Sequence, residues 1–160
     1  MILVKLLFLC THNACRSVLA ESIARQTGEH LWTVASAGSQ PAGQVHPDTL
    51  AVLIEKKFPV EGLSSKSWDE VSQFTPDAVI TVCDQAAGES CPVWFGSAVK
   101  AHWGLPDPTK HADPAQRRQL FEDVIATLHS RLDRLAAFLT QTSPVDKDQL
   151  QSELQRLGEN

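Results

Sequence analysis

The sequence predicts an α/β fold, a single domain in which a four-stranded parallel sheet is flanked by helices on both faces. Short apolar runs alternate with longer segments in which apolar residues recur every three or four positions. This alternation is typical of parallel strands joined by crossover helices. The length of 160 residues fits one domain. A composition of 42% hydrophobic and 21% charged residues is ordinary for a globular protein.

The four predicted strands are short apolar runs, and the second of them ends at Gly38. They occupy residues 2–9, 31–37, 77–83 and 99–103. Ligands of such sheets bind in the loops that leave the carboxyl ends of the strands. Cys10, Cys83 and the segment after Trp103 all fall at such ends. The sequence therefore places its candidate site at that edge of the sheet.

The predicted helices begin at capping signals or at an apolar periodicity. These starts are residue 15, His46-Pro47, Ser67 with Glu70 as a capping box, Asp113-Pro114, and the series Leu150, Leu154 and Leu157 closed by Gly158. We expect residues 1–142 to form the catalytic domain. Residues 143–160 are expected to be a C-terminal extension, a short helix that is either solvated or a face for self-association.

The net charge and the N-terminal segment exclude several kinds of function. A net charge of -5 argues against broad nucleic-acid binding, although a local pocket can still attract an anion. The apolar run at residues 2–9 is too short to span a membrane and lacks a signal-peptide cleavage site. We therefore expect a cytoplasmic protein. Structural disulfides are rare there, so Cys10, Cys15, Cys83 and Cys91 call for a chemical explanation.

The segment after the first strand carries the strongest chemical signal. Cys10 and Arg16 are separated by five residues, and Ser17 follows. A loop that leads from a strand into a helix presents backbone N–H groups and the positive end of the helix dipole. Arg16 adds a planar set of donors, so we expect Cys10 to have a depressed pKa and to be largely thiolate. Ser17 can donate to that thiolate, and Asn13 tolerates the left-handed backbone of a tight loop.

Two other interpretations of this segment are weaker. Cys10, His12 and Cys15 could ligate zinc, but their spacing is poor for a structural site and no further pair of ligands is near. We therefore expect no metal. A purely structural role for the two cysteines does not explain Arg16 and Ser17.

Residues 10–17, Cys-Thr-His-Asn-Ala-Cys-Arg-Ser, closely resemble the phosphate loop of low-molecular-weight protein tyrosine phosphatases and of the arsenate reductases that share their fold. We call these residues the phosphate loop. The resemblance implies that Cys10 is the nucleophile, Arg16 the oxyanion clamp and Ser17 the residue that tunes the thiolate. It also implies that Asn13 holds the loop shape and that Cys15 is structural. The implied oxyanion-binding residues are Thr11, His12, Asn13, Ala14, Cys15 and Arg16, with His12 at a position where the family often has glycine.

An Asp-Pro pair follows the fourth strand, at Asp107-Pro108. A leaving oxyanion needs a proton, and a carboxylic acid within hydrogen-bond reach can supply it. Alone, such an aspartate is more often a turn residue before proline. The resemblance implies that Asp107 is the general acid.

The chain departs from the phosphatases in its aromatic residues and in its cysteines. It contains no tyrosine, and Thr109-Lys110 follow the Asp-Pro pair where phosphatases usually have tyrosines. Cys83 and Cys91 flank a glycine-containing segment and suit a thiol relay. Most of residues 2–140 resemble arsenate reductases. Tyrosine phosphatase activity remains the alternative, with an inactive oxyanion-binding module as a third hypothesis.

The resemblance implies a complete reaction. Cys10 attacks arsenate, Cys83 resolves the adduct to a disulfide with Cys10, and Cys91 then attacks Cys83. No cofactor is expected to be bound, and the reductant is glutathione with glutaredoxin, or thioredoxin. Residues 86–96 look more like the glutathione-linked group. We expect a monomer or weak dimer with residual phosphatase activity.

Some relatives bind potassium beside the phosphate loop, at places that match Glu21, Ser36 and a position near Lys66. An ammonium at Lys66 would do the electrostatic work of that cation, so we expect no bound potassium. A lysine exposed on a turn is the equal alternative.

Overall fold

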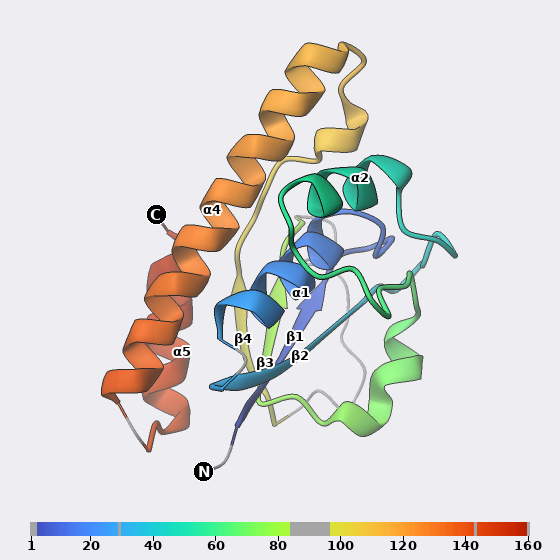
Figure 1. Cartoon of the computed structure of the whole chain (residues 1–160). Coiled ribbons are helices and arrows are strands. Elements are labelled where there is room, and N and C mark those ends of the chain that lie inside the picture. Colours follow the sequence, from blue (N-terminus) through green and yellow to red (C-terminus); the bar gives the residue numbers. More distant parts are fainter. Residues whose placement is uncertain (1–2, 29, 84–96, 143, 160) are drawn as a thin grey trace.

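The computed structural model describes residues 3–28, 30–83, 97–142 and 144–159. Its centre is a four-stranded sheet in the order β2-β1-β3-β4, in which every neighbouring pair is parallel. The strands are β1 (Val4–Leu9), β2 (Trp32–Ala37), β3 (Ala78–Thr81) and β4 (Val99–His102). The predicted sheet and strand order along the chain are therefore confirmed (Figure 1).

The third strand is shorter than predicted at its carboxyl end. Leu9, the last residue of β1, pairs with Thr81, and the next residue of each strand turns into a loop. Cys83 therefore lies just beyond the sheet rather than inside it, close to the start of the phosphate loop.

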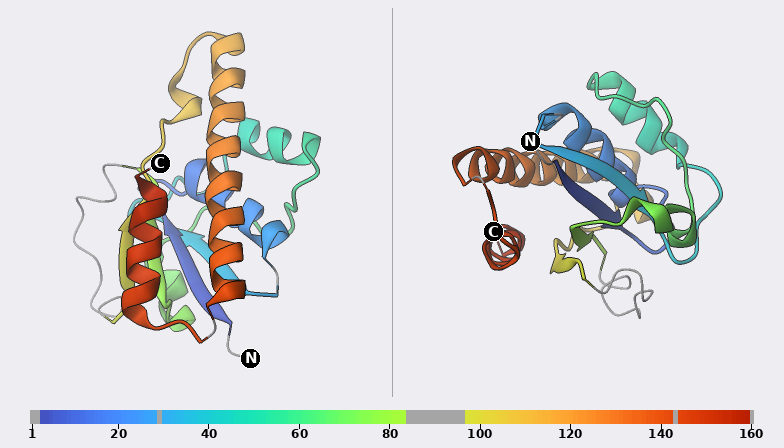
Figure 2. Two further views of the ribbon diagram at one scale, coloured as in Figure 1. Left: turned by 90° about the vertical axis from the view of Figure 1, so that its left-hand side faces the viewer. Right: turned by 90° about the horizontal axis from the view of Figure 1, so that it is seen from below.

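Three helices cover one face of the sheet. They are α1 (Arg16–Thr27), α4 (Pro114–Gln141) and α5 (Lys147–Gly158), and the two views in Figure 2 show α4 and α5 side by side along the sheet. Leu6 and Phe8 of β1 point into this layer and are fully buried. The apolar stripe of α4 supplies most of the remaining core, because Phe121, Leu128 and other residues of that stripe are buried.

The other face of the sheet is covered differently. In the described part of the chain it packs against the 3-10 helix η1 (Trp68–Phe74), whose Trp68, Val71 and Phe74 lie against a second buried cluster around Leu7 and Leu9. The predicted capping box is present, since Ser67 accepts from the Asp69 amide and Glu70 accepts from the Ser67 amide.

The C-terminal segment forms the expected helix, α5, which begins at its own capping box. Leu150, Leu154 and Leu157 are buried against β4 and α4. The indole Nε1 of Trp103 donates to the Leu154 carbonyl at 2.8 Å. This apolar face therefore belongs to the main core, and the division of the chain at residue 142 stays a prediction.

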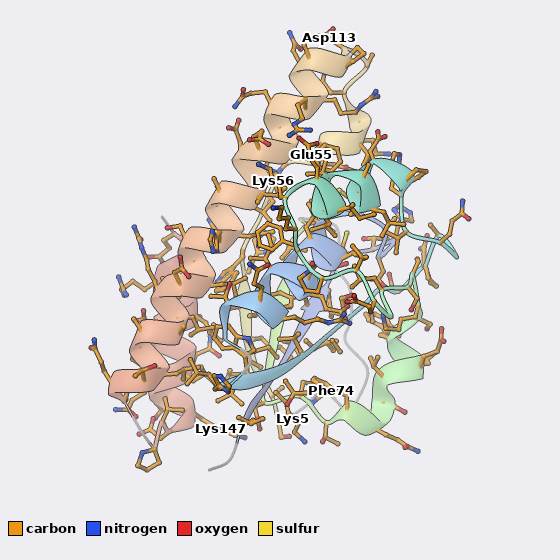
Figure 3. The ribbon with its side chains drawn as sticks, viewed as in Figure 1. Lys5, Glu55, Lys56, Phe74, Asp113 and Lys147 are labelled. Carbon is orange, nitrogen blue, oxygen red and sulfur yellow. The ribbon has the colours of Figure 1, made fainter. Side chains whose placement is uncertain are left out.

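The carboxyl ends of the strands carry α2 (Pro47–Glu55) and the short 3-10 helix η3 (Pro108–Lys110), both at the end of the sheet toward which the arrows point (Figure 1). As predicted, His46 caps α2 and proline follows it. Ion pairs join α2 to α4, with Glu55 accepting two bonds from Arg118 at 2.6 and 2.8 Å. Figure 3 shows Glu55 and Lys56 at this junction, and Lys56 lies 2.8 Å from Glu122.

Within the described residues, every helix is too short or too polar to cross a membrane.

Candidate active site

Backbone amides of the segment after β2 bind the carbonyl groups of the phosphate loop. The carbonyls of Thr11, His12 and Ala14 accept from the backbone amides of residues 40, 42 and 46 at 2.9, 3.0 and 3.0 Å. Asn13 has a φ of 47°, the left-handed conformation expected from the sequence. With its carbonyls turned outward, the loop leaves its amides available.

Four consecutive amides are available to an anion. The N–H groups of Asn13, Ala14, Cys15 and Arg16 donate no hydrogen bond to the described part of the chain. They lie at the N-terminus of α1, where the helix dipole favours negative charge. The loop can therefore bind a tetrahedral oxyanion, as its sequence predicts.

The Asn13 side chain lies at the centre of a buried network. Its Nδ2 donates to Ser17 Oγ at 2.7 Å and to Ser36 Oγ at 3.0 Å, and its Oδ1 accepts from the Lys66 amide at 2.9 Å. These bonds fit the expected role in holding the loop shape. Ser17 forms no hydrogen bond to Cys10 here, so its expected donation to the thiolate stays a prediction.

Two thiols meet at the base of the loop. Cys10 and Cys83 are 5% and 3% exposed, and Cys83 lies near enough to Cys10 to raise its pKa. The Thr11 amide also donates to Cys83 Sγ at 3.4 Å. We call Cys10 and Cys83 the thiol pair.

The expected depression of the Cys10 pKa is wrong for this arrangement. The hydrogen bond with Cys83 raises the pKa of Cys10 above its ordinary value, and burial raises it further. The Arg16 charge and the His12 amide act in the opposite direction but do not overcome these two causes. Adjacent thiols cannot both ionise easily, so a thiolate on Cys10 requires that Cys83 keeps its proton.

Cys15 is separate from the thiol pair. It caps α1 without a side-chain capping bond and is 5% exposed. Burial raises the pKa of Cys15 to about 12, and the nearby charge of Asp107 adds to that effect. This thiol is protonated near neutral pH, which fits the expected structural role.

Arg16 and Asp107 face each other beside the loop. Arg16 Nη1 donates to the Leu105 carbonyl at 3.0 Å, and Nη2 lies 3.5 Å from Asp107 Oδ2. The Nε of Arg16 is buried and has no hydrogen-bond partner among the described residues. A buried donor without a partner costs free energy, and a bound oxyanion would satisfy it.

The cation beside Glu21 is Arg25 and not Lys66. Glu21 is 4% exposed, and its carboxylate accepts from Ser36 Oγ at 2.6 Å and from Arg25 Nη2. The Lys66 ammonium instead contacts the carbonyl and hydroxyl of Ser64 at 3.2 and 3.4 Å. Lys66 serves the loop through its backbone amide, so the hypothesis that its ammonium replaces potassium is wrong here.

Replacing Arg25 by glutamine is expected to lower the free energy of unfolding by about 1–3 kcal/mol, because it leaves the buried Glu21 carboxylate without its cation. Urea unfolding measures the change. A Glu21→Gln/Arg25→Gln double variant should recover most of the loss. Arg118→Gln, which breaks the ion pairs with Glu55 and Glu122 at the surface, is the control and should cost much less. A double variant as unstable as Arg25→Gln would contradict this explanation.

The structure brings Cys10, Arg16, Cys83 and Asp107 together, and it leaves His12 exposed at the rim. Cys91 lies outside the described residues. Across those residues, the His, Cys, Asp and Glu side chains form no group of three that could hold a metal ion.

Sequence reasoning missed Gly38 and Thr109. A methyl group on Gly38 would lie 2.4 Å from the Thr11 carbonyl oxygen and 2.5 Å from that of Cys10, so only glycine allows β2 to approach the loop. A glycine at the end of a strand beside a candidate loop is the signal that could have found it. Thr109 donates to Asp107 from its amide and its hydroxyl. The amide contact is the turn that an aspartate before proline favours, whereas the hydroxyl contact has no comparable signal in the sequence.

Residues 5–150 match the family described as low molecular weight phosphotyrosine protein phosphatase. This chain belongs to that family. It is 32% identical over 130 residues to an arsenate reductase of Bacillus licheniformis. The match covers 81% of this chain and 92% of the relative. The predicted resemblance to the arsenate reductases of the low molecular weight phosphatase family is thus confirmed.

Solved structures of the same fold agree with this assignment. A structure described as an arsenate reductase in the phosphate binding state has a TM-score of 0.71 and 27% sequence identity. The match covers 86% of this chain and 99% of that chain. A thioredoxin-dependent arsenate reductase of Corynebacterium glutamicum has a TM-score of 0.67 and 25% identity, over 87% of this chain and 63% of that one. The low molecular weight phosphatase fold therefore extends over most of this chain.

Proposed function

We propose that this protein reduces arsenate to arsenite, with an external thiol as the final source of electrons. The observation that carries the proposal is the thiol pair: a second buried thiol, Cys83, accepts from the Thr11 amide next to Cys10 and acts on the pKa of Cys10, at the base of the phosphate loop. The similarity to arsenate reductases supports it.

In the first step, the free loop amides and Arg16 bind arsenate as a tetrahedral anion. Cys10 must carry the single negative charge of the thiol pair, and the Arg16 guanidinium and His12 amide favour that form. The sulfur then attacks arsenic, forming an S–As bond. One arsenic–oxygen bond breaks, and Asp107 gives a proton to the departing oxygen, which leaves as water.

In the second step, Cys83 loses its proton and attacks the sulfur of Cys10. A disulfide forms between Cys10 and Cys83 as the S–As bond breaks, and its electron pair stays on arsenic. Arsenic is thereby reduced from the +5 to the +3 state and leaves as arsenite, while the two thiols are oxidised. Cys91 is proposed to take over the disulfide from Cys10, so that an external thiol can regenerate the enzyme.

The thiol pair also separates the proposal from its alternative. A tyrosine phosphatase would hydrolyse its cysteine adduct with water and has no use for a second thiol beside the nucleophile. The lack of any tyrosine in the chain further weakens recognition of an aryl substrate. Phosphatase activity is proposed to be residual.

The external reductant is proposed to be thioredoxin or glutathione with glutaredoxin. The thioredoxin dependence of the Corynebacterium relative favours thioredoxin. The sequence of residues 86–96, which resembles the glutathione-linked group, favours glutathione with glutaredoxin. The cytoplasmic location and the monomeric or weakly dimeric state stay predictions.

The test is arsenite release from arsenate with each reductant system, with p-nitrophenyl phosphate hydrolysis measured in parallel. We expect arsenite formation with at least one reductant and none from Cys10→Ser. Rapid ester hydrolysis without arsenite would contradict the proposal and support the phosphatase alternative.

A further inference from the structure

The two carboxylate oxygens of Asp107 have different surroundings. Oδ1 accepts from the Thr109 amide at 2.9 Å and from the Thr109 hydroxyl at 2.6 Å. Oδ2 lies 3.5 Å from Arg16 Nη2. The carboxylate is therefore held from one side by Thr109 and faces the oxyanion clamp with its other oxygen.

This asymmetry determines which oxygen can carry a proton. A carboxylate oxygen has two lone pairs for hydrogen bonding, and both of those on Oδ1 are occupied by Thr109. A proton on Oδ1 would displace one of these donors. The acid form of Asp107 therefore carries its proton on Oδ2, the oxygen that faces Arg16.

We propose that Thr109 is a positioning residue of the reaction, whose hydroxyl keeps the Asp107 proton on the oxygen that faces the bound anion. This inference rests on the proposed function, in which Asp107 protonates the departing oxygen. It gives a role to the threonine that stands where the phosphatases usually have tyrosine.

A substitution at position 109 can remove the hydroxyl bond to Asp107 while keeping the backbone amide bond. Asp107 is the N-cap of η3, and its bond from the amide at position 109 belongs to that cap and survives most substitutions. Without the hydroxyl, one lone pair of Oδ1 becomes free. The proton can then reside on either oxygen, and the carboxyl group can turn its acidic hydrogen away from the anion.

The test compares Thr109→Val, which keeps the size of the side chain and removes the hydroxyl, with Thr109→Ser, which keeps the hydroxyl. We expect Thr109→Val to lower kcat for arsenate by about tenfold, the size of effect typical of one hydrogen bond to a charged group. KM for arsenate and the affinity for phosphate should stay the same, because the anion binds to the loop and Arg16. Thr109→Ser should restore kcat to nearly the value of the unaltered protein.

Two controls show whether the effect passes through Asp107. In an Asp107→Asn background, adding Thr109→Val should cause no further loss of kcat. Thr127→Val in α4 removes a hydroxyl that, among the described residues, bonds within its own helix, and this variant should leave kcat unchanged. The inference is overturned if Thr109→Val turns over normally, if Thr109→Ser is as slow as Thr109→Val, or if the losses from positions 107 and 109 add.

Failure of the proposed function gives a different result. If the unaltered protein releases no arsenite but hydrolyses p-nitrophenyl phosphate, arsenate reduction is wrong. The kcat values of Thr109→Val and Thr109→Ser for that ester, relative to the unaltered protein, then decide the role of Thr109. A protein that performs neither reaction contradicts both the proposed function and the role of Thr109.

Discussion

Replacing Cys83 by alanine is expected to accelerate alkylation of Cys10 and, in the same protein, to abolish sustained arsenite release. The hydrogen bond from Cys83 is the largest cause that raises the Cys10 pKa. Its removal lowers that pKa, so more Cys10 is thiolate at a given pH, and each unit of decrease gives about tenfold more thiolate when the thiol is mostly protonated. Arsenite release stops because the thiol that is proposed to attack the Cys10–arsenic adduct has been removed.

Iodoacetamide labelling followed by mass spectrometry measures the first effect, and arsenite formation over many turnovers measures the second. In the unaltered protein, Cys10 alkylation should still be rising as pH increases from 7 to 9, because the raised pKa keeps the thiol protonated. In Cys83→Ala the curve should move to lower pH.

Cys15 is the internal control for this experiment. It is buried with a pKa of about 12, so it should remain unlabelled in both proteins. Unchanged Cys10 labelling in Cys83→Ala would show that the thiols are not paired in solution. Undiminished arsenite release from the same variant would show that another thiol resolves the adduct.

Gly38→Ala is expected to disable the phosphate loop. The added methyl group would lie 2.4 and 2.5 Å from the carbonyl oxygens of Thr11 and Cys10, which are backbone atoms that cannot rotate away. The loop or the end of β2 must move, at a cost of about 1–3 kcal/mol in the free energy of unfolding. Phosphate affinity should fall by at least about tenfold, because the loop amides lose their common orientation.

Calorimetric phosphate titration and urea unfolding measure these two effects. Gly158→Ala is a matched control, since its methyl group would lie 2.5 Å from the His102 carbonyl oxygen and touch no residue of the phosphate loop. It should reduce stability without reducing phosphate affinity. Equal losses of phosphate affinity in both variants would mean that general destabilisation, and not the clash at the loop, weakens binding.

The elements that follow local rules could be predicted from the sequence. The strand runs, the proline after His46 and the capping box at Ser67 and Glu70 produced the expected structures, because periodicity and capping depend on neighbouring residues. The left-handed backbone of Asn13 and the cluster of Cys10, Arg16 and Asp107 also match the prediction. Parallel strands end at one edge, so residues far apart in sequence could be placed together.

The errors concern interactions whose sign depends on distance and burial. A cysteine beside an arginine at a helix N-terminus predicts a low pKa, but a neighbouring buried thiol reverses the direction for Cys10. The sequence left Lys66 open between a replacement for potassium and a lysine exposed on a turn; in the structure Arg25, one helical turn after Glu21, reaches that carboxylate. Spacing along a helix could have indicated Arg25.

By itself, the sequence determined the α/β fold, and it predicted the loop that would bind an oxyanion and the residues that would act on it. Those features depend on residue type and on short-range spacing. Only the tertiary structure decided that Cys83 lies beside Cys10 and raises its pKa, that Gly38 leaves room for the loop, and that Thr109 holds one oxygen of Asp107. Contacts within 2–4 Å between distant segments arise from how the helices and strands pack together, and protonation follows those contacts.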